Sequence, residues 1–370
     1  MYRIGIDLGG TNIAVGVVNE EYEIVAEASL PTGAQRPAEQ VVADMCRAVE
    51  LAMEKAGITA AHCASIGIGS PGTCDGENGV VARAYNLGWF NVPVCAMMTE
   101  HFGLPCHLSN DANCAALAET VAGAAVGCRS MVLITLGTGV GGGIIQDGRI
   151  ISGVGGTGAE VGHALLVLDG EPCTCGRNGC WEAYASATAL IRQGKRAAQA
   201  DPASLLAGYG EKLTGKDVFD AASQGDAAAR AVVAQYCVYV AAGITDLVNI
   251  LGPEMVLVGG GISRQGEALL GPVREYVADH CFGGRLRQLR VFRQRHDAPD
   301  TIHCVQEPHA AQRHPTHRYP AHPAKTRRHK QRHRAHDAQL GAQRHAAALD
   351  IAFQIAFVEP GAHEPLVQAL

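Results

Sequence analysis

The feature that most limits the fold of this 370-residue chain is a unit that occurs twice: a buried strand, a tight glycine turn and a second strand. The two units span residues 2–18 and 131–145. Because glycine carries no side chain, successive backbone amides in such a turn can approach a phosphate oxygen closely. The repeat therefore predicts an α/β protein with two phosphate-binding turns. The turn residues are Gly9, Gly10 and Thr11 in the first unit and Gly137, Thr138 and Gly139 in the second.

The rest of the pattern alternates strands and helices. Residues 37–57 place apolar side chains along one helical face and end at a glycine, which predicts an amphipathic helix. A long helix over about residues 227–251 and a strand over 255–258 lead to a third glycine cluster. Ligands of open α/β sheets bind where loops converge at the carboxyl ends of strands. Three glycine turns therefore suggest one nucleotide, and the third turn consists of Gly259, Gly260 and Gly261.

Side chains beside the first two turns support the phosphate interpretation. Asp7 ends a strand, where a carboxylate can hold Mg2+ directly or through water. The hydroxyls of Thr11 and Thr138 can bond phosphate oxygens. Taken alone, each glycine turn could instead mark a simple hairpin. The combination predicts a site for the phosphates of a nucleotide with Mg2+.

Asn110 and Asp111 follow a strand and open an alanine-rich helix. One interpretation is an ordinary helix N-cap. The other is a catalytic site, because phosphoryl transfer to a hydroxyl needs a carboxylate that orients the nucleophile and accepts its proton. Under the second interpretation Asp111 is the general base and Asn110 holds a neighbouring hydroxyl. Glu160, His163 and Glu182 would complete this polar pocket.

Four potential metal ligands follow the pattern H-x9-C-x-C-x4-C. They are His163, Cys173, Cys175 and Cys180. Three thiolates and one imidazole form the ligand set of a closed, four-coordinate structural Zn2+ site, with no open position for hydrolytic chemistry. A histidine bound through one ring nitrogen keeps the other free for a substrate hydroxyl. The alternative is that the three thiols are small buried hydrophobic groups.

Composition limits the cellular context. Apart from this trio, the 13 cysteines are scattered, so we interpret them as reduced packing residues. We find no leader peptide and no uninterrupted apolar run of about 20 residues that would span a bilayer. We therefore expect a cytoplasmic protein that does not bind membranes. A net charge of -6 gives no reason to expect a nucleic-acid partner.

Six motifs occur in a fixed order: Gly5-Ile-Asp-Leu-Gly-Gly-Thr11, Ser109-Asn-Asp-Ala-Asn113, Leu136-Gly-Thr-Gly139, Gly158-Ala-Glu-Val-Gly-His163, Cys173-Thr-Cys-Gly-Arg-Asn-Gly-Cys180 and Trp181-Glu-Ala-Tyr-Ala-Ser186. Together they resemble the ROK family of sugar kinases and repressors, and most of all its bacterial glucokinases. The resemblance spans about residues 2–286. It implies an actin-like (ribonuclease H-like) two-domain ATPase fold, with an active-site cleft between the domains. It also implies ATP-dependent phosphorylation of the 6-hydroxyl of glucose.

The resemblance also implies roles for individual residues. It puts the base at Asp111, sugar contacts at Asn110, Glu160, His163 and Glu182, and zinc at the His/Cys array. It further implies a dimer or tetramer. Family repressors carry a helix-turn-helix before the first phosphate strand, whereas here that strand begins at Tyr2, which disfavours DNA binding. Two alternatives stay open: another hexose (N-acetylmannosamine, allose or fructose), or a degenerate ROK protein that binds sugar without turnover.

We expect an N-terminal domain over residues 1–118, a C-terminal domain over 119–286 and an anomalous, disordered tail over 287–370. Of 16 histidines, 11 lie beyond residue 290, and the tail's 13 basic and 7 acidic residues give +6 against -12 for the first 286. Our hypothesis is a reading-frame shift near residues 286–292, because GC-rich DNA read out of frame yields such codons. The gene sequence would refute it if no other frame encoded the family's closing segment. A basic nucleic-acid arm and a histidine-rich metal tract are the alternatives.

Overall fold

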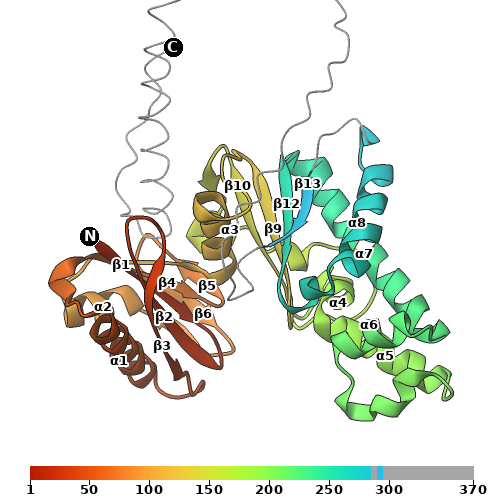
Figure 1. Cartoon of the computed structure of the whole chain (residues 1–370), viewed down its shortest axis with the longest axis horizontal. Coiled ribbons are helices and arrows are strands. Elements are labelled where there is room, and N and C mark those ends of the chain that lie inside the picture. The colour runs from red at the N-terminus through yellow and green to blue at the C-terminus, as the bar shows by residue number, and fades with distance from the viewer. Residues whose placement is uncertain (285–289, 295–370) are drawn as a thin grey trace, which may run out of the picture. The chain divides into compact units, whose positions relative to one another are not determined.

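The computed structural model describes residues 1–284 and 290–294 (Figure 1). Its N-terminal sheet has five strands in the order β3-β2-β1-β4-β8. They are β1 (Tyr2–Leu8), β2 (Asn12–Val18), β3 (Ile24–Pro31), β4 (Cys63–Ser70) and β8 (Cys106–Asn110). The three neighbouring strands β1, β4 and β8 are parallel, so their carboxyl ends meet at one edge of the sheet. That edge carries Asp7, Ser70 and Asn110.

One face of this sheet is covered by helix α1 (Ala38–Ala56), with α2 (Val94–Phe102) nearby. The apolar stripe of α1, including Val41, Met45 and Val49, shares one buried core with alternate residues of β1. The helix ends at Gly57, whose φ of 68° suits glycine and whose N–H bonds the carbonyl of Glu54. The amphipathic helix expected over residues 37–57 is confirmed. A small antiparallel sheet comprises β5 (Thr73–Asp75), β6 (Val80–Ala84) and β7 (Trp89–Val92).

The second large sheet repeats the strand–turn–strand start and has the order β11-β10-β9-β12-β13. Its strands are β9 (Met131–Leu136), β10 (Val140–Gln146), β11 (Arg149–Ile150), β12 (Met255–Gly259) and β13 (Arg290–Arg293). Strands β9 and β10 are antiparallel, whereas β12 runs parallel to both β9 and β13. The second and third glycine turns therefore leave the same edge of this sheet.

Helices α4 to α8 belong to the second half of the chain. Besides α1 and α2, the α-helices are α3 (Asp111–Ala122), α4 (Glu182–Ala185), α5 (Ala187–Ala200), α6 (Gly215–Ser223), α7 (Ala227–Leu251) and α8 (Glu267–His280). The short 3-10 helices are η1 (Ala60–His62), η2 (Val154–Gly156), η3 (Val161–His163), η4 (Leu205–Lys212) and η5 (Gly261–Gln265). Helix α3 packs on β10 so closely that a Cβ at Gly143 would lie 2.5 Å from the Cβ of Ala116. It therefore shares its core with the second sheet, although it begins at the end of β8.

Helix α7 qualifies the expectation that no segment could span a bilayer. Among the described residues, it is the one helix long and apolar enough to do so. Half of that stretch is buried, and Tyr236, Val240 and Ile244 lie in the core around the second sheet. Core helices of globular proteins meet the same length and composition test, so α7 is weak evidence for a membrane span.

The second sheet extends beyond residue 286, where we expected the regular fold to end. Strand β13 pairs with β12 over four residues, from Met255 opposite Arg290 to Val258 opposite Arg293. Val291 on this strand is buried. The tail from residue 295 onward, and with it the expectation of disorder, lies outside the described residues.

Candidate active site

The first glycine turn connects β1 to β2. Gly9 donates its N–H to the carbonyl of Asn12 at 2.9 Å, and its own carbonyl accepts a 2.7 Å hydrogen bond from the Thr32 hydroxyl. A Cβ at Gly10 would lie 3.3 Å from Nδ2 of Asn86, so the Asn86 side chain lies close to the turn. The Thr11 side chain is exposed. The turn therefore has a fixed backbone and an accessible hydroxyl, as a phosphate site requires.

The second turn is held by a carboxylate from α4. Gly137 N–H bonds the carbonyl of Gly139 at 3.0 Å, which closes the turn. The backbone N–H of Val140 donates to Oε2 of Glu182 at 3.0 Å. A Cβ at Gly139 would lie only 2.3 Å from the same oxygen. A side chain at 139 would therefore displace this carboxylate from the turn.

The third turn adjoins the second one. Gly260 has a φ of 78°, which favours glycine, and a Cβ there would lie 2.6 Å from the backbone nitrogen of Leu136. Gly259, at the end of β12, pairs with Thr135 on the neighbouring strand β9. The structure thus brings two of the three predicted glycine turns together at one sheet edge.

Asn110 is the N-cap of α3, as the simpler interpretation of the sequence expected. Its Oδ1 accepts hydrogen bonds from the backbone nitrogens of Ala112 at 2.9 Å and Asn113 at 3.4 Å. Its Nδ2 donates to the carbonyl of Gly72 at 3.1 Å. A carboxamide NH2 has two hydrogens, so one donor remains for a ligand. The capping role and a ligand contact are therefore compatible.

Asp111 begins the same helix and lies near two other acidic groups. Desolvation by the surrounding protein raises the pKa of Asp111, and the carboxylates of Asp7 and Glu160 raise it further. Desolvation also raises the pKa of Asp7. A raised pKa makes Asp111 a better proton acceptor than an ordinary surface carboxylate. The structure thus brings together three carboxylates predicted from separate motifs.

The four predicted metal ligands converge at one place. Their donor atoms all lie within 4.8 Å of one another. Sγ of Cys175 and Sγ of Cys180 are 3.6 Å apart, and Nδ1 of His163 is 3.7 Å from Sγ of Cys173. Ligands at about 2.3 Å from a tetrahedral Zn2+ are separated by about 3.8 Å. These separations are compatible with a tetrahedral ion, for which Nδ1 of His163, the ring nitrogen near Cys173, would be the histidine ligand.

The thiols of this cluster differ in acidity. A hydrogen bond from the backbone N–H of Arg177 lowers the pKa of Cys175 to about 7. Desolvation raises the pKa of Cys173 to about 12, and the neighbouring thiols contribute to the increase. A cation at the centre would favour the thiolate form of all three.

Sequence analysis missed Arg177 as a member of the site. Its guanidinium donates to the main-chain carbonyl of His163 and to Sγ of Cys180, the latter at 3.7 Å. It thus brings a positive charge to a cluster of three potential thiolates. The signal was present in the sequence, because an arginine stands inside the Cys-x-Cys-x4-Cys loop.

Glu182 has contacts that its predicted role as a sugar ligand did not include. Its Oε1 accepts a hydrogen bond from the Thr174 hydroxyl at 3.2 Å and lies 3.7 Å from Sγ of Cys173. Its Oε2 accepts from Val140, as described above. An ionised carboxylate has about four lone-pair positions, so a sugar hydroxyl could still donate to it. Glu182 therefore connects the segment that carries Cys173 and Thr174 to the second phosphate turn.

A cavity of about 1090 Å³ reaches this region from the N-terminal sheet. Its lining includes Asp7, Asp111 and Thr135, and it continues over the small residues Gly5 and Gly67 toward the far end of the sheet. Most of it thus extends away from His163 and Glu182. Two of the three carboxylates line its wall, but the cavity as a whole is not the polar pocket that the motifs predict.

Known proteins resemble this chain over most of its length. The model of the ROK family matches residues 3–299. A glucokinase from Thermotoga maritima is 40% identical over 282 residues, which cover 75% of this chain and 87% of that protein. A glucokinase from Halalkalibacterium halodurans is 38% identical over 279 residues, covering 74% of this chain and 84% of that one.

A solved structure agrees with these relatives. The ROK family glucokinase from Streptomyces griseus, in complex with glucose and AMPPNP, has a TM-score of 0.68 and 38% identity, covering 80% of this chain and 94% of that one. The fold and the site thus define an actin-like ATPase, as the motifs implied. More particularly, the chain belongs to the ROK family. The family match extends to residue 299 and so includes residues 286–292, where our hypothesis places a reading-frame shift.

Proposed function

We propose that this chain is a glucokinase that transfers the γ-phosphoryl group of ATP to the 6-hydroxyl of glucose. The observation that carries the proposal is the position of Asp111, at the end of β8 with a raised pKa and with Asp7 and Glu160 close enough to influence it. Its relatives at 38–40% identity are glucokinases, which supports glucose over other hexoses. A cytoplasmic location and a dimer or tetramer are parts of this proposal.

In the proposed mechanism, Asp111 orients the 6-hydroxyl and accepts its proton as the oxygen attacks the γ-phosphorus. The remaining Nδ2 hydrogen of Asn110 donates to a neighbouring sugar oxygen. Glu160 and Glu182 accept hydrogen bonds from other hydroxyls, and Nε2 of His163 contacts the same face of the sugar. These contacts hold the acceptor oxygen in place for reaction, which is the main contribution that a phosphoryl-transfer site makes.

The three glycine turns bind the nucleotide in this proposal. The backbone amides at Gly9, Gly10, Gly137 and Gly139 hold phosphate oxygens, with help from the hydroxyls of Thr11 and Thr138. The turn at Gly259, Gly260 and Gly261 lies against the adenosine. Asp7 would hold Mg2+, and the ion when bound would neutralise charge on the phosphates.

His163, Cys173, Cys175 and Cys180 hold a structural Zn2+ in this proposal, supported by donor separations close to tetrahedral edges. When bound, zinc fixes the tautomer and orientation of the imidazole. His163 then presents Nε2 to the sugar without a search among rotamers. The ion takes no part in the chemistry, because the four ligands fill its coordination sphere.

A coupled assay of glucose-dependent ADP production tests the proposal. It should be run on the full chain, on Asp111→Ala and on a chain whose tail is restored by correcting the suspected frame. Turnover in the full chain that Asp111→Ala abolishes, with glucose binding retained, is the expected result. N-acetylmannosamine, allose and fructose serve as competing acceptors, and faster turnover of one of them would overturn the choice of glucose.

The composition change after residue 286 favours a second candidate, a ROK protein that binds glucose without phosphorylating it. Silence in the full chain with turnover in the restored chain would assign the defect to the tail. Silence in both chains, with glucose still bound, would favour the second candidate.

A further inference from the structure

The three cysteines lie on a hairpin, residues 164–181, which we call the cysteine hairpin. Its outer part, with Cys175, is exposed, whereas Cys180 and Trp181 at its end are buried. Its arms pair through isolated bridges between Leu165 and Cys180 and between Pro172 and Asn178. Leu165 and Leu168 are 55% and 76% exposed, so the outer arm buries little apolar surface. A two-stranded hairpin without an apolar core is marginally stable in water. Contacts with other elements must therefore help to hold it.

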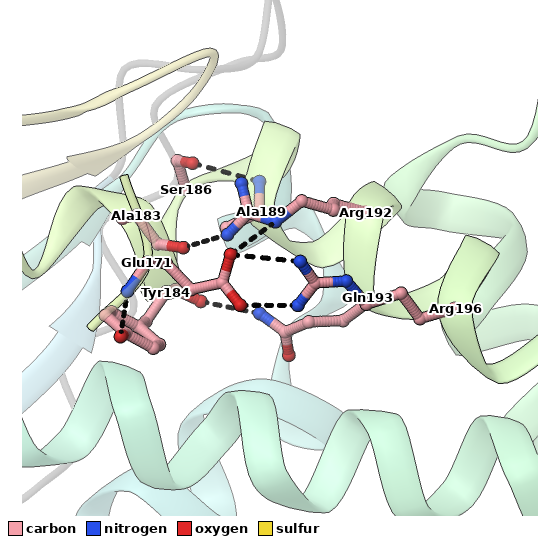
Figure 2. Close-up of polar contacts among 8 residues, drawn as sticks. All are labelled: Glu171, Ala183, Tyr184, Ser186, Ala189, Arg192, Gln193 and Arg196. Carbon is pink, nitrogen blue, oxygen red and sulfur yellow. Dashed lines mark hydrogen bonds and ion pairs between the residues drawn. The ribbon is translucent and has the colours of Figure 1, made fainter. Parts of the chain in front are cut away.

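A polar network at the base of the cysteine hairpin provides such contacts (Figure 2). The guanidinium of Arg196 donates to both oxygens of the Glu171 carboxylate, with Nη2 at 3.0 Å from Oε2. Nε of Arg192 lies 3.7 Å from the same Oε2. Both arginines belong to α5, so the carboxylate connects the hairpin to a helix. The paired geometry of the Arg196 contact also restricts the orientation of the hairpin.

A second link passes through the backbone. Glu171 donates its N–H to the hydroxyl of Tyr184 at 2.7 Å, and the Tyr184 side chain is buried. The carbonyl of Tyr184 in turn accepts a 2.9 Å hydrogen bond from Gln193 of α5. A Cβ at Gly170 would lie 2.0 Å from the Tyr184 hydroxyl, so the close approach requires glycine there. The side chain of Glu171 is thus held by Arg192 and Arg196, and its backbone by Tyr184.

We infer that Glu171, together with Tyr184, Arg192 and Arg196, positions the cysteine hairpin before any metal binds. An isolated exposed ion pair contributes little to stability, but here two arginines and a buried hydroxyl act on a single residue. Because the hairpin is already ordered, metal binding does not have to supply that ordering free energy. Glu171 is a positioning residue, since it is neither a metal ligand nor a predicted sugar contact.

The same network influences the predicted sugar contacts. The cysteine hairpin carries Thr174, which bonds Glu182, and Arg177, which bonds the carbonyl of His163. If the hairpin were loosened, the Glu182 carboxylate and the His163 backbone would therefore both lose a contact that orients them. The inference rests on the proposed function for this consequence, but the ordering of the hairpin can be measured without metal or sugar.

The test compares Glu171→Gln with Glu211→Gln in the full chain. Glu211 pairs with Lys195, also on α5, but contacts no part of the cysteine hairpin in any described interaction, so it controls for loss of an ion pair on the same helix. After removal of metal by EDTA, we expect amides of residues 165–181 to exchange about tenfold faster in Glu171→Gln and unchanged in Glu211→Gln. Tyr184→Phe, which removes only the backbone link, should give a smaller increase over the same residues.

Zinc affinity gives the second readout, by competition with a chromophoric chelator. We expect Glu171→Gln to bind Zn2+ about 10-fold more weakly, and saturating Zn2+ to restore its KM for glucose. The Glu211→Gln control separates this effect from general destabilisation, because saturating Zn2+ would also stabilise a weakened fold by mass action. Equal exchange in Glu171→Gln and the unaltered chain, or the same acceleration in Glu211→Gln, would overturn the inference. If the unaltered chain takes up no zinc, the proposed metal site is wrong, and the exchange comparison alone decides the role of Glu171.

Discussion

Replacing Gly139 by alanine tests how the second phosphate turn is held. The new Cβ would lie 2.3 Å from Oε2 of Glu182, far inside van der Waals contact. The carboxylate would have to turn away, and its hydrogen bonds with the Val140 N–H at 3.0 Å and the Thr174 hydroxyl at 3.2 Å would be lost. The substitution therefore acts on stability through a side chain 43 positions away in sequence (182 minus 139).

The expected cost follows from those two bonds. A hydrogen bond to a charged group contributes about 1.5–3 kcal/mol, and the exposed hydroxyl contact contributes less. Gly139→Ala should therefore lower the free energy of unfolding by about 2–3 kcal/mol. For a chain of this size, with an unfolding entropy of about 2.1 cal/mol/K per residue, that corresponds to a decrease in Tm of about 3–5 °C.

Urea and thermal unfolding, followed by circular dichroism without ligands, measure this cost. Gly137→Ala is the matched control, because a Cβ there meets no atom within 4 Å and stiffens the unfolded chain in the same way. The decisive variant adds Glu182→Ala, which removes the obstacle. In that background Gly139→Ala should cost nothing. An equal cost with and without the Glu182 side chain would refute the reasoning.

Three further predictions concern the core, the base and the metal site. Gly243→Ala would place a Cβ 2.1 Å from the buried indole of Trp181. Urea unfolding should therefore show a decrease of about 2–3 kcal/mol in the free energy of unfolding. Gly208→Ala is the control and should be near neutral, because a Cβ at Gly208 meets no atom within 4 Å. Because the folded-state pKa of Asp111 is raised, its negative charge opposes folding at pH values above that pKa. Asp111→Asn should therefore raise Tm at pH 7, and this advantage should shrink as the pH falls through the raised pKa and disappear below about 4. An equal gain at pH 7 and below pH 4 would contradict this. For the same reason, kcat/KM of the unaltered chain should begin to fall at a higher pH than it would with an ordinary carboxylate as base. Zinc analysis should find about one ion per chain, and Cys175→Ser should reduce that occupancy; equal zinc in both would exclude Cys175 as a ligand.

Much of the fold follows from local patterns. The helix that ends at Gly57 was predictable because its apolar spacing and terminal glycine are both local signals. The convergence of the four metal ligands was predictable because their spacing in sequence limits their separation in space. Strand β13 was not expected, because composition changes abruptly around residues 287–294 while the backbone still pairs with β12.

The contacts that hold the site were harder to predict. Nothing in the local sequence shows that Glu182 accepts a hydrogen bond from Val140, since the two come together only when α4 packs beside the second turn. The bond between Arg177 and the His163 carbonyl likewise depends on the closure of the cysteine hairpin. Sequence motifs indicate which groups carry chemistry, whereas the groups that orient them come from tertiary contacts.

The N-cap at Asn110 restricts how the sugar preference of such a chain can evolve. Its oxygen already caps α3, and Ser, Thr, Asp, Asn and Gly are the residues favoured at such a position. Any replacement that widened or reshaped the pocket at this position with an apolar side chain would uncap the helix that carries Asp111. Substitution at residue 110 is thus confined to a small set of residues, and Asp alone among them keeps both the cap and the shape while removing the donor. New acceptor preferences would have to arise from substitutions elsewhere around the sugar.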